Sequence, residues 1–407
     1  MNGLEKLVLR EGGCSAEVYL YGAHVTSWKN AQGEELLFLS SKALFEPPKA
    51  IRGGIPICFP QFSNLGSQSL PPHGFAHNRL WALDAHPQLD PPPNATAAFT
   101  EAQAVEREGG MNGLEKLVLR EGGWSAEVYL YGGHVSSWKN AQGEELLFLS
   151  SKALFEPPKA IRGGIPICFP QFSNLGSLPP HGFARNRLWA LDADPQLDPP
   201  PNATAAFVDL ILSPSHDDFK AYPHSFEYRL RVQLGPGGVL TLTSRVRNTN
   251  SDGKPFSFTF AYHTYFSVSD ISEVRVEGLE TLDYLDNLQD RSRFTEQGDA
   301  ITFEGELDRI YLEAPRKIAI LDHEKNRTFL VIKDGLPDAV VWNPWDKKAK
   351  AMSDFGDEEY KHMVCVEAAA IEDPVTLKPT EEWTGRLQLS LVPNTHVGGS
   401  LDVPNAL

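Results

Sequence analysis

Residues 256–266, with the sequence FSFTFAYHTYF, alternate between large apolar side chains and smaller or more polar ones. Successive side chains of a β-strand point to opposite faces of the sheet, so a period of two predicts a strand. One face would carry Phe256, Phe258, Phe260 and Tyr262. The other face would carry Ser257, Thr259, Ala261, His263 and Tyr265. The fold is expected to be built from strands of this kind.

The same signal recurs on both sides of this stretch. Residues 239–246 (VLTLTSRV) alternate in the same way, and residues 125–130 and 364–368 also favour strands. Helical periodicity is scarce, and only residues 354–361 suggest a short helical turn. The chain has 31 Pro and 33 Gly, which suits short strands joined by turns better than a helical bundle. We therefore predict an all-β protein, a large antiparallel sandwich.

Composition excludes several classes of protein. The net charge of −16 argues against a nucleic acid or an anionic membrane surface as partner. An anionic substrate would need a local arginine cluster to overcome that field. No stretch approaches the roughly 18 apolar residues of a membrane span. Four scattered Cys, with no dense framework, indicate free thiols in a reducing compartment, so we expect a cytoplasmic protein.

The N-terminal part of the chain is a near copy of the part that follows it. Residues 1–67 match residues 111–177, and after two inserted residues the match continues to Phe99 and Phe207. One long, almost unchanged repeat differs from the short, serial and divergent repeats of solenoids. It favours a partial duplication or a joined gene model, with a designed tandem as the alternative. We predict a partial duplicate at 1–99, a flexible linker at 100–110 (TEAQAVEREGG) and a complete domain at 111–407.

Two loops carry basic residues with unusual neighbours. In residues 161–172, IRGGIPICFPQF, two glycines follow Arg162, and a rigid loop of this kind can hold a guanidinium for bidentate anion binding. The alternative is a tight turn with a surface arginine. In residues 179–189, PPHGFARNRLW, His181, Arg185 and Arg187 form either the rim of a ligand site or a solvated basic loop.

Three further residues are candidates for chemistry. His263 has aromatic flanks suited to a sugar ring, although a lone strand histidine is more often structural. Glu367 lies in the apolar run HMVCVEAAAI, where a carboxylate is costly unless it is paired or functional, and burial would make it a better base near neutral pH. Asp286 either accepts hydrogen bonds from ligand hydroxyls or forms a turn. No phosphate-binding loop, GxSxG elbow, CxxC or HExxH pattern is present, so no metal or cofactor is expected.

Taken together, these segments resemble the glucose-6-phosphate 1-epimerase family of the aldose 1-epimerase superfamily. The matching pieces, in family order, are IRGGIPICFPQF, HGFARN, FAYHTYFSVSD, VEGLETLDYLDN, VVWNPWDKKAKAMSDFGDEEY and VCVEAAAI. The resemblance implies a galactose-mutarotase-like β-supersandwich. It also implies interconversion of the α and β anomers of glucose 6-phosphate by reversible ring opening, without a cofactor.

The resemblance assigns a role to each candidate residue. His263 matches the general acid that protonates the ring oxygen, and Glu367 matches the general base that takes the proton of the anomeric hydroxyl. The substrate-binding matches are Arg162 and Arg185 for the phosphate, His181 for the rim, Asp286 for a hydroxyl and Gln171 for the pocket wall.

The extra N-terminal copy departs from the family pattern. It has His77 in place of Arg185 and lacks partners for His263 and Glu367, so it forms no site of its own. It could expose strand edges, or it could take the place of residues 111–207 in the sandwich. We expect residues 111–207 to occupy that place.

Two alternatives remain open for the function. One is an epimerase for unphosphorylated aldoses, and the other is a carbohydrate-binding protein without catalysis on the same scaffold. We expect a monomer that binds a small phosphosugar, with neither nucleic acid nor membrane as partner.

Overall fold

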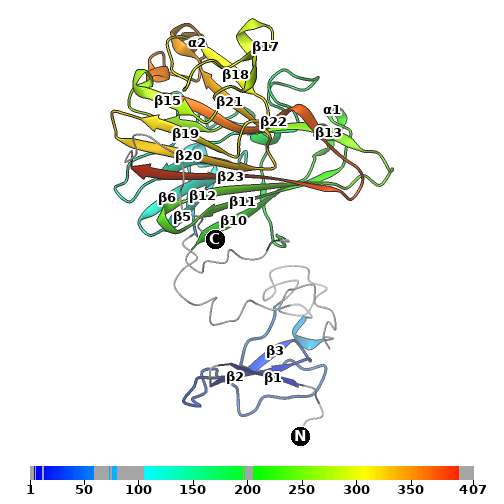
Figure 1. Ribbon diagram of the computed structural model, residues 1–407. Coiled ribbons are helices and arrows are strands. Elements are labelled where there is room, and N and C mark those ends of the chain that lie inside the picture. Colours follow the sequence, from blue (N-terminus) through cyan, green and yellow to red (C-terminus); the bar gives the residue numbers. More distant parts are fainter. Residues whose placement is uncertain are drawn as a thin grey trace. The chain divides into compact units, whose positions relative to one another are not determined.

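The computed structural model describes residues 4, 6–11, 13–58, 73, 76–79, 105–195, 197 and 205–393. The chain divides into two compact units, Met1–Ala98 and Phe99–Leu407 (Figure 1). The first unit contains the duplicated segment, and the second contains its repeat together with the rest of the chain.

The second unit is a sandwich of two large antiparallel sheets (Figure 1). One sheet has, in spatial order, β15 (Val274–Glu277), β19 (Lys317–Asp322), β20 (Arg327–Asp334), β23 (Glu382–Pro393), β12 (Leu240–Asn248), β11 (Phe226–Leu234), β10 (Ala206–Leu212) and β9 (Ala190–Leu191). The other has β17 (Ser292–Thr295), β16 (Asp283–Asp286), β18 (Leu307–Tyr311), β21 (Asp338–Asn343), β22 (Met363–Leu377), β13 (Phe256–Tyr262) and β8 (Ile167–Cys168), and β14 (Tyr265–Ser267) pairs with β22. The predicted all-β antiparallel sandwich is confirmed.

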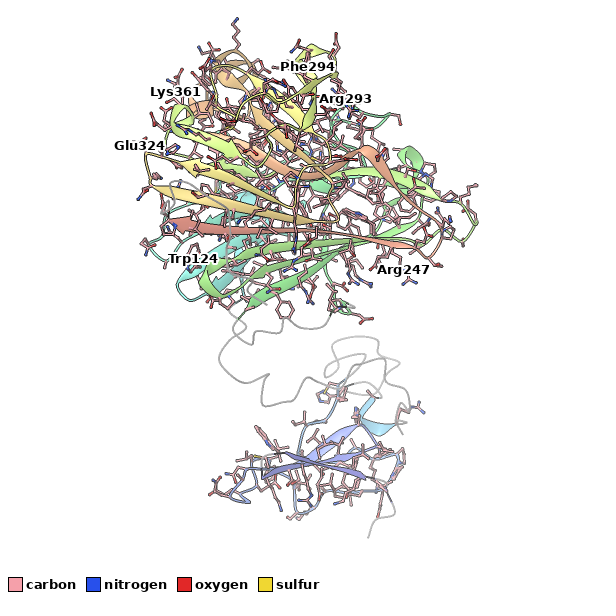
Figure 2. All side chains as sticks on the ribbon, in the orientation of Figure 1. Trp124, Arg247, Arg293, Phe294, Glu324 and Lys361 are labelled. Atoms are coloured by element: carbon pink, nitrogen blue, oxygen red, sulfur yellow. The ribbon has the colours of Figure 1, made fainter. Side chains whose placement is uncertain are left out.

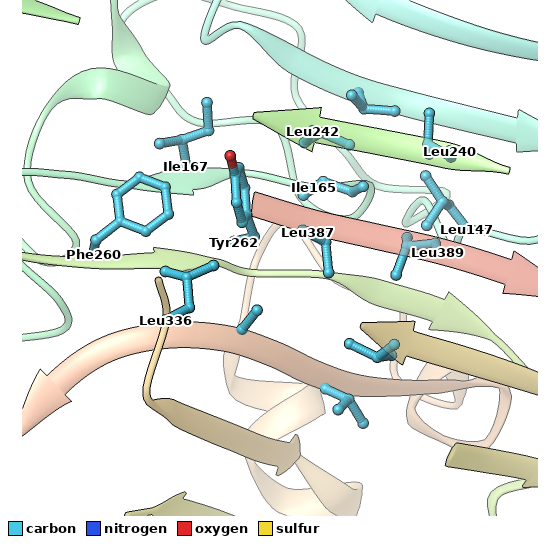
Figure 3. Close-up of a cluster of buried hydrophobic side chains, with 14 of the residues drawn as sticks. Leu147, Ile165, Ile167, Leu240, Leu242, Phe260, Tyr262, Leu336, Leu387 and Leu389 are labelled. Carbon is cyan, nitrogen blue, oxygen red and sulfur yellow. The ribbon is translucent and has the colours of Figure 1, made fainter. Parts of the chain in front are cut away.

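The main core fills the space between these two sheets. Figure 3 shows Leu240 and Leu242 of β12 and Leu387 and Leu389 of β23 near the aromatic side chains of β13. Phe260 is fully buried there, as the alternation of residues 256–266 predicts. Burying such side chains contributes roughly 1.5–3 kcal/mol each, so this apolar face fixes the register of β13.

The predicted strand 256–266 is interrupted in the structure. β13 ends at Tyr262 and β14 begins at Tyr265, so His263 and Thr264 lie at a break between them. Both strands still pair with β22, and the backbone N–H of Thr264 bonds back to the carbonyl of Tyr262 at 2.8 Å. The break places His263 in a local turn beside β22 rather than within a regular ladder.

Residues 105–109 are not the flexible linker that their composition suggests. They form β4 (Val105–Gly109), the edge of a small sheet with β5 (Glu115–Glu121), β6 (Trp124–Tyr129) and β7 (His134–Lys139). Cross-strand ion pairs join Glu106 to Arg120 and Glu108 to Lys116. The charged side chains that suggested a linker thus form ion pairs with the neighbouring strand. Residues 100–104 lie outside the described part of the chain.

Helices are short and peripheral. The α-helices in the described ranges are α1 (His216–Ala221) and α2 (Trp345–Ala351), and short 3₁₀ turns include η3 (Ala184–Asn186), η6 (Asn287–Gln289) and η7 (Glu359–His362). Long charged side chains such as Arg247, Arg293 and Glu324 lie on the outside (Figure 2). Among the described residues, no helix is long and apolar enough to cross a membrane.

In its described residues, the first unit shows a small part of this architecture. Its three-stranded sheet consists of β1 (Lys6–Glu11), β2 (Cys14–Tyr19) and β3 (His24–Lys29), and η1 spans Ala76–Asn78. Tyr19 packs on Phe45 with ring centroids 5.0 Å apart, as Tyr129 packs on Phe155 in the second unit. The local cluster is therefore reproduced, but the large sheets belong to the second unit.

Candidate active site

Strand pairing brings the two candidate catalytic residues together. Tyr262 of β13 lies opposite Ala368 of β22, and the two strands are antiparallel. His263, which follows Tyr262, therefore lies beside Glu367, which precedes Ala368. His263 Nδ1 lies 3.1 Å from Glu367 Oε1. The backbone N–H of His263 donates to the carbonyl of Pro166 at 2.9 Å, which fixes the break after β13.

Both members of this pair are buried, and burial disfavours both charged forms. Burial raises the pKa of Glu367 well above its usual value, and the nearby Asp308 carboxylate raises it further, against the opposing effect of Arg185. Burial also lowers the pKa of His263, as do His181, Arg162 and Arg185. Across the 3.1 Å contact, burial therefore favours the neutral form of each group, a protonated Glu367 and an uncharged imidazole.

This neutral pair is incompletely hydrogen-bonded. Among the described residues, neither His263 Nδ1 nor Glu367 Oε2 has a partner with hydrogen-bond geometry. Unpartnered buried polar atoms cost about 1–3 kcal/mol each, which a protein tolerates chiefly where a ligand completes the set. The pair is thus poised to exchange protons with a bound molecule.

Two aromatic side chains wall in His263. The Tyr265 ring stacks on the imidazole with centroids 4.6 Å apart, and Trp342 packs edge-on at 5.7 Å. The Tyr265 hydroxyl lies 3.4 Å from His263 Nε2. Alternation places Tyr265 on the face of His263 already in the sequence, but nothing there assigned it a role, and Trp342 gave no signal.

A cavity of about 300 Å³ opens beside this wall, lined by Leu154, Lys159, Ala160, Ile161, Arg162, Pro166, Arg185, Asn186, Tyr265, Ser353 and Asp354. Arg162 is held by Asp354, with its Nε and Nη2 each 3.2 Å from Oδ2, and its Nη1 donates to the Tyr265 hydroxyl at 3.1 Å. The Tyr265 phenol and, after it, the Asp354 carboxylate raise the pKa of Arg162.

Arg185 is the second guanidinium at the cavity. Its Nη2 donates to the carbonyl of Pro180 at 2.7 Å, while its buried Nε has no partner among the described residues. Burial lowers its pKa, and Arg162 adds to that effect. Two neighbouring guanidiniums with unused donors favour an anion in the cavity.

The glycines after Arg162 are required by the backbone. Gly163 and Gly164 have φ of 109° and 63°, conformations that L side chains rarely adopt. A Cβ on Gly163 would meet the carbonyl of Phe148, and one on Gly164 would meet that of Val135. The loop therefore packs backbone against backbone, which holds Arg162 in place.

His181 lies next to the pair, with its ring 5.4 Å from that of His263. Its Nδ1 accepts the backbone N–H of Ser173 at 3.3 Å and lies 3.0 Å from Cys168 Sγ. Burial, then Arg185 and Arg162, lower its pKa to about 3, so the ring is neutral. With Nδ1 as acceptor, Nε2 carries the proton and can donate to a ligand.

Three candidates are engaged elsewhere. The amide of Gln171 bonds to Ser173 and Leu178 and closes the loop between them. Asp286 caps the turn after β16 by accepting from Leu288 and Gln289. Arg187 makes a two-nitrogen contact with Asp218. None of Gln171, Asp286 and Arg187 lines the cavity, and a ligand-binding role for the first two stays a prediction.

Asp308 of β18 is an acidic residue that the sequence interpretation missed. It lies opposite Trp342 of β21, which lies opposite Cys365 of β22, so Asp308 shares the face of Glu367. Asn287 donates to it at 2.7 Å, and burial raises its pKa. The sequence LDRIY of residues 307–311 does not alternate, so it gives no signal for Asp308.

Comparisons with known proteins agree with this fold. The family model for aldose 1-epimerase matches residues 5–109 and again 115–390. A protein of Cenchrus ciliaris named "Putative glucose-6-phosphate 1-epimerase" is 70% identical over 292 residues, covering 72% of this chain and 89% of its own length. A protein of the same name from Salmonella typhimurium is 32% identical over 312 residues, covering 76% and 96%.

Solved structures give the same result. The crystal structure of a "putative mutarotase" from Salmonella typhimurium superposes with a TM-score of 0.63 and 29% identity, covering 72% of this chain and 95% of that one. A galactose mutarotase-like protein from Clostridium acetobutylicum shares the fold with a TM-score of 0.53 at 19% identity, covering 71% and 98%. The chain belongs to the aldose 1-epimerase family.

Proposed function

We propose that the protein is a hexose-6-phosphate 1-epimerase that interconverts the α and β anomers of glucose 6-phosphate. The observation that carries the proposal is the 3.1 Å contact between two buried groups, His263 and Glu367, beside a cavity lined by two guanidiniums. The names of the relatives support the same substrate.

The pair can carry out both proton transfers of mutarotation. Glu367 as general base takes the proton of the C1 hydroxyl while His263 as general acid protonates the ring oxygen, and the C1–O5 bond breaks. Rotation about C1–C2 presents the other face of the aldehyde, and reversal of both transfers closes the ring to the other anomer. Each positioned group contributes typically about 10²–10⁴-fold.

The working form needs the pair's proton on His263, whereas burial favours a protonated Glu367. This transfer runs through solvent, from the Glu367 carboxyl to His263 Nε2, because Nδ1 of the neutral ring already carries a proton. Arg162 and Arg185 both lower the pKa of His263, whereas of these two arginines only Arg185 lowers the pKa of Glu367. A bound phosphate dianion offsets both positive charges, so it raises the pKa of His263 more than that of Glu367 and favours this transfer. Substrate binding thus prepares the acid.

The guanidiniums distinguish this proposal from an epimerase for unphosphorylated aldoses. A neutral sugar gives Arg162 and Arg185 no anion to bind, and two adjacent cations without one repel each other. A carbohydrate-binding protein without catalysis has no use for a buried acid–base pair, which costs stability.

Anomer exchange followed by NMR tests the proposal. Purified protein should accelerate the exchange of glucose 6-phosphate well above that of glucose at equal concentration. Equal, slow exchange of both sugars with and without protein would refute an enzymatic function. Equal acceleration of both would instead favour the unphosphorylated-aldose epimerase.

We also propose a cytoplasmic monomer with one active site per chain, built from residues 111–407. The described cysteines are all free, and Cys168 and Cys365 are buried thiols beside the site, which suits a reducing compartment. Light scattering after size exclusion measures the oligomeric state, and cell fractionation tests the location.

A further inference from the structure

The Tyr265 hydroxyl lies between the anion cavity and the candidate acid. Its ring lines the cavity and stacks on His263. Its oxygen accepts a hydrogen bond from Arg162 Nη1 at 3.1 Å, and the same oxygen lies 3.4 Å from His263 Nε2. Within the described residues, Tyr265 thus forms a direct bridge from the cavity to the imidazole.

The direction of this bridge follows from the partners of the Tyr265 hydroxyl, which are Arg162 and His263 among the described residues. The guanidinium of Arg162 can only donate, so the phenolic oxygen is its acceptor and the single O–H proton remains for another partner. The nearby acceptor is the unprotonated Nε2 of neutral His263. In the empty site, therefore, Tyr265 occupies the imidazole nitrogen that faces away from Glu367.

An anion in the cavity would compete for the same two groups. A phosphate oxygen accepts from Arg162 and from the Tyr265 hydroxyl, and hydrogen bonds to a charged acceptor are about twice as strong as those between neutral groups. The distance of 3.4 Å between the Tyr265 hydroxyl and His263 Nε2 is long for a hydrogen bond, so the Tyr265 O–H would bond more strongly to the phosphate.

We propose that Tyr265 is a positioning residue that sets specificity: its hydroxyl holds His263 Nε2 in the empty site and transfers its hydrogen bond to the substrate's phosphate, which frees Nε2 for the sugar ring. This inference rests on the proposed function. It makes the phosphate group an activator of the acid as well as a handle for binding.

The charged and titratable groups around His263 agree with such a device. Glu367 faces it from β22, His181 from the adjacent loop, and the two guanidiniums from the cavity. The two arginines and His181 all lower the pKa of His263, and only an added anion reverses the arginines' effect. Release of Nε2 and restoration of its basicity therefore occur together.

A binding experiment tests the switch without relying on activity. Protein labelled with ¹⁵N-histidine is titrated with inorganic phosphate at pH 7, and the His263 resonances are assigned from their absence in His263→Gln. In the wild type, Nε2 should move from an acceptor towards a protonated shift as phosphate saturates. In Tyr265→Phe, which keeps the ring stack, the Nε2 resonance should already lack the tyrosine contact and respond less. An Nε2 signal that saturating phosphate leaves unmoved in the wild type overturns the inference.

Kinetics separate this role from a structural one. Tyr265→Phe should lower the preference for glucose 6-phosphate over glucose by about fivefold, the change expected when one hydrogen bond is lost, mainly in kcat. Inorganic phosphate should accelerate turnover of glucose by the wild type and not by Tyr265→Phe. Both rates are corrected for the anomer exchange of glucose measured in phosphate without enzyme. Tyr222→Phe, which loses a hydroxyl bonded to Ser257 away from the cavity, is the matched control and should behave as wild type.

The outcomes are distinct from failure of the proposed function. If the wild type does not accelerate exchange of glucose 6-phosphate, the proposed function fails, and the NMR titration still decides whether phosphate releases His263. If the wild type is active but Tyr265→Phe slows both sugars equally, Tyr265 is structural and the inference is wrong.

Discussion

Replacing Glu367 by Gln should abolish catalysis and stabilise the fold at neutral pH. The amide has nearly the volume of the carboxylate, so a side chain that is 1% exposed keeps its packing. It cannot accept a proton as a base, and loss of a general base costs about 10²–10⁴-fold in kcat. Binding of the sugar phosphate should change little, because the guanidiniums remain.

The stability effect has a definite sign. Burial raises the pKa of Glu367 well above 4.5, so the folded state favours the neutral acid, and wild-type stability falls as pH rises above about 4.5. Each unit of upward shift is worth about 1.4 kcal/mol. Glutamine carries no such penalty. The two proteins should be equally stable near pH 4, and the variant should be the more stable by pH 7.5.

Chemical denaturation at both pH values, paired with NMR anomer exchange, measures the two effects. Glu304→Gln, at an exposed glutamate, is the matched control and should alter neither activity nor the pH dependence of stability. A folded Glu367→Gln protein within about tenfold of wild-type kcat would refute the role of general base. A variant less stable than wild type at pH 7.5 would show that the carboxyl is not held neutral by burial.

Three further predictions concern the cavity, the duplicate and the fit of the second copy. Arg185→His, the residue at the matching position of the first copy, should raise KM for glucose 6-phosphate by about 10–100-fold, the value of a lost charged hydrogen bond, and leave glucose unaffected; an equal change for both sugars contradicts a phosphate contact. Removal of Met1–Ala98 should leave anomer exchange unchanged, whereas loss of activity would show that the first unit takes part. Trp124→Cys, the change found in the first copy, should cost about 2–4 kcal/mol by denaturant titration, because Trp124 stacks on Trp138 at 6.2 Å and covers Gly238; a loss below about 0.5 kcal/mol would mean that this contact adds nothing.

Local patterns predicted the strands because the alternation of apolar and polar residues within a strand shows which of its faces is buried. Phe256, Phe258 and Phe260 are all buried as expected. The break at His263 could not be read from the sequence, since it depends on a hydrogen bond to Pro166, far away in the chain. Likewise, residues 105–109 have the charged composition of a solvated linker, and their sequence alone does not show that these charges pair with the neighbouring strand.

Chemical cost in its local setting singled out one residue of the site. Glu367 stood out because a carboxylate in an apolar strand is expensive, and the structure places it beside His263. Asp286 had no such anomaly, and it serves as a turn cap. Asp308 reaches the site through register across several strands, which a single sequence does not reveal, and the role of Tyr265 depends on its contact with Arg162.

The fit of each copy to the large sheets explains why one chain should have one site. Trp28 is 50% exposed in the first unit, whereas the matching Trp138 is fully buried and donates to the carbonyl of Gly238. Ala23 replaces Gly133, whose added Cβ would lie 3.1 Å from Trp189 and whose φ is positive. The first copy therefore carries a methyl group that would crowd Trp189 at this position, and exchange between the copies is opposed by sterics as well as by connectivity. The double change Gly133→Ala with Ala23→Gly should reverse this bias, and if limited proteolysis still released an inert first unit from that variant, the steric argument would be wrong.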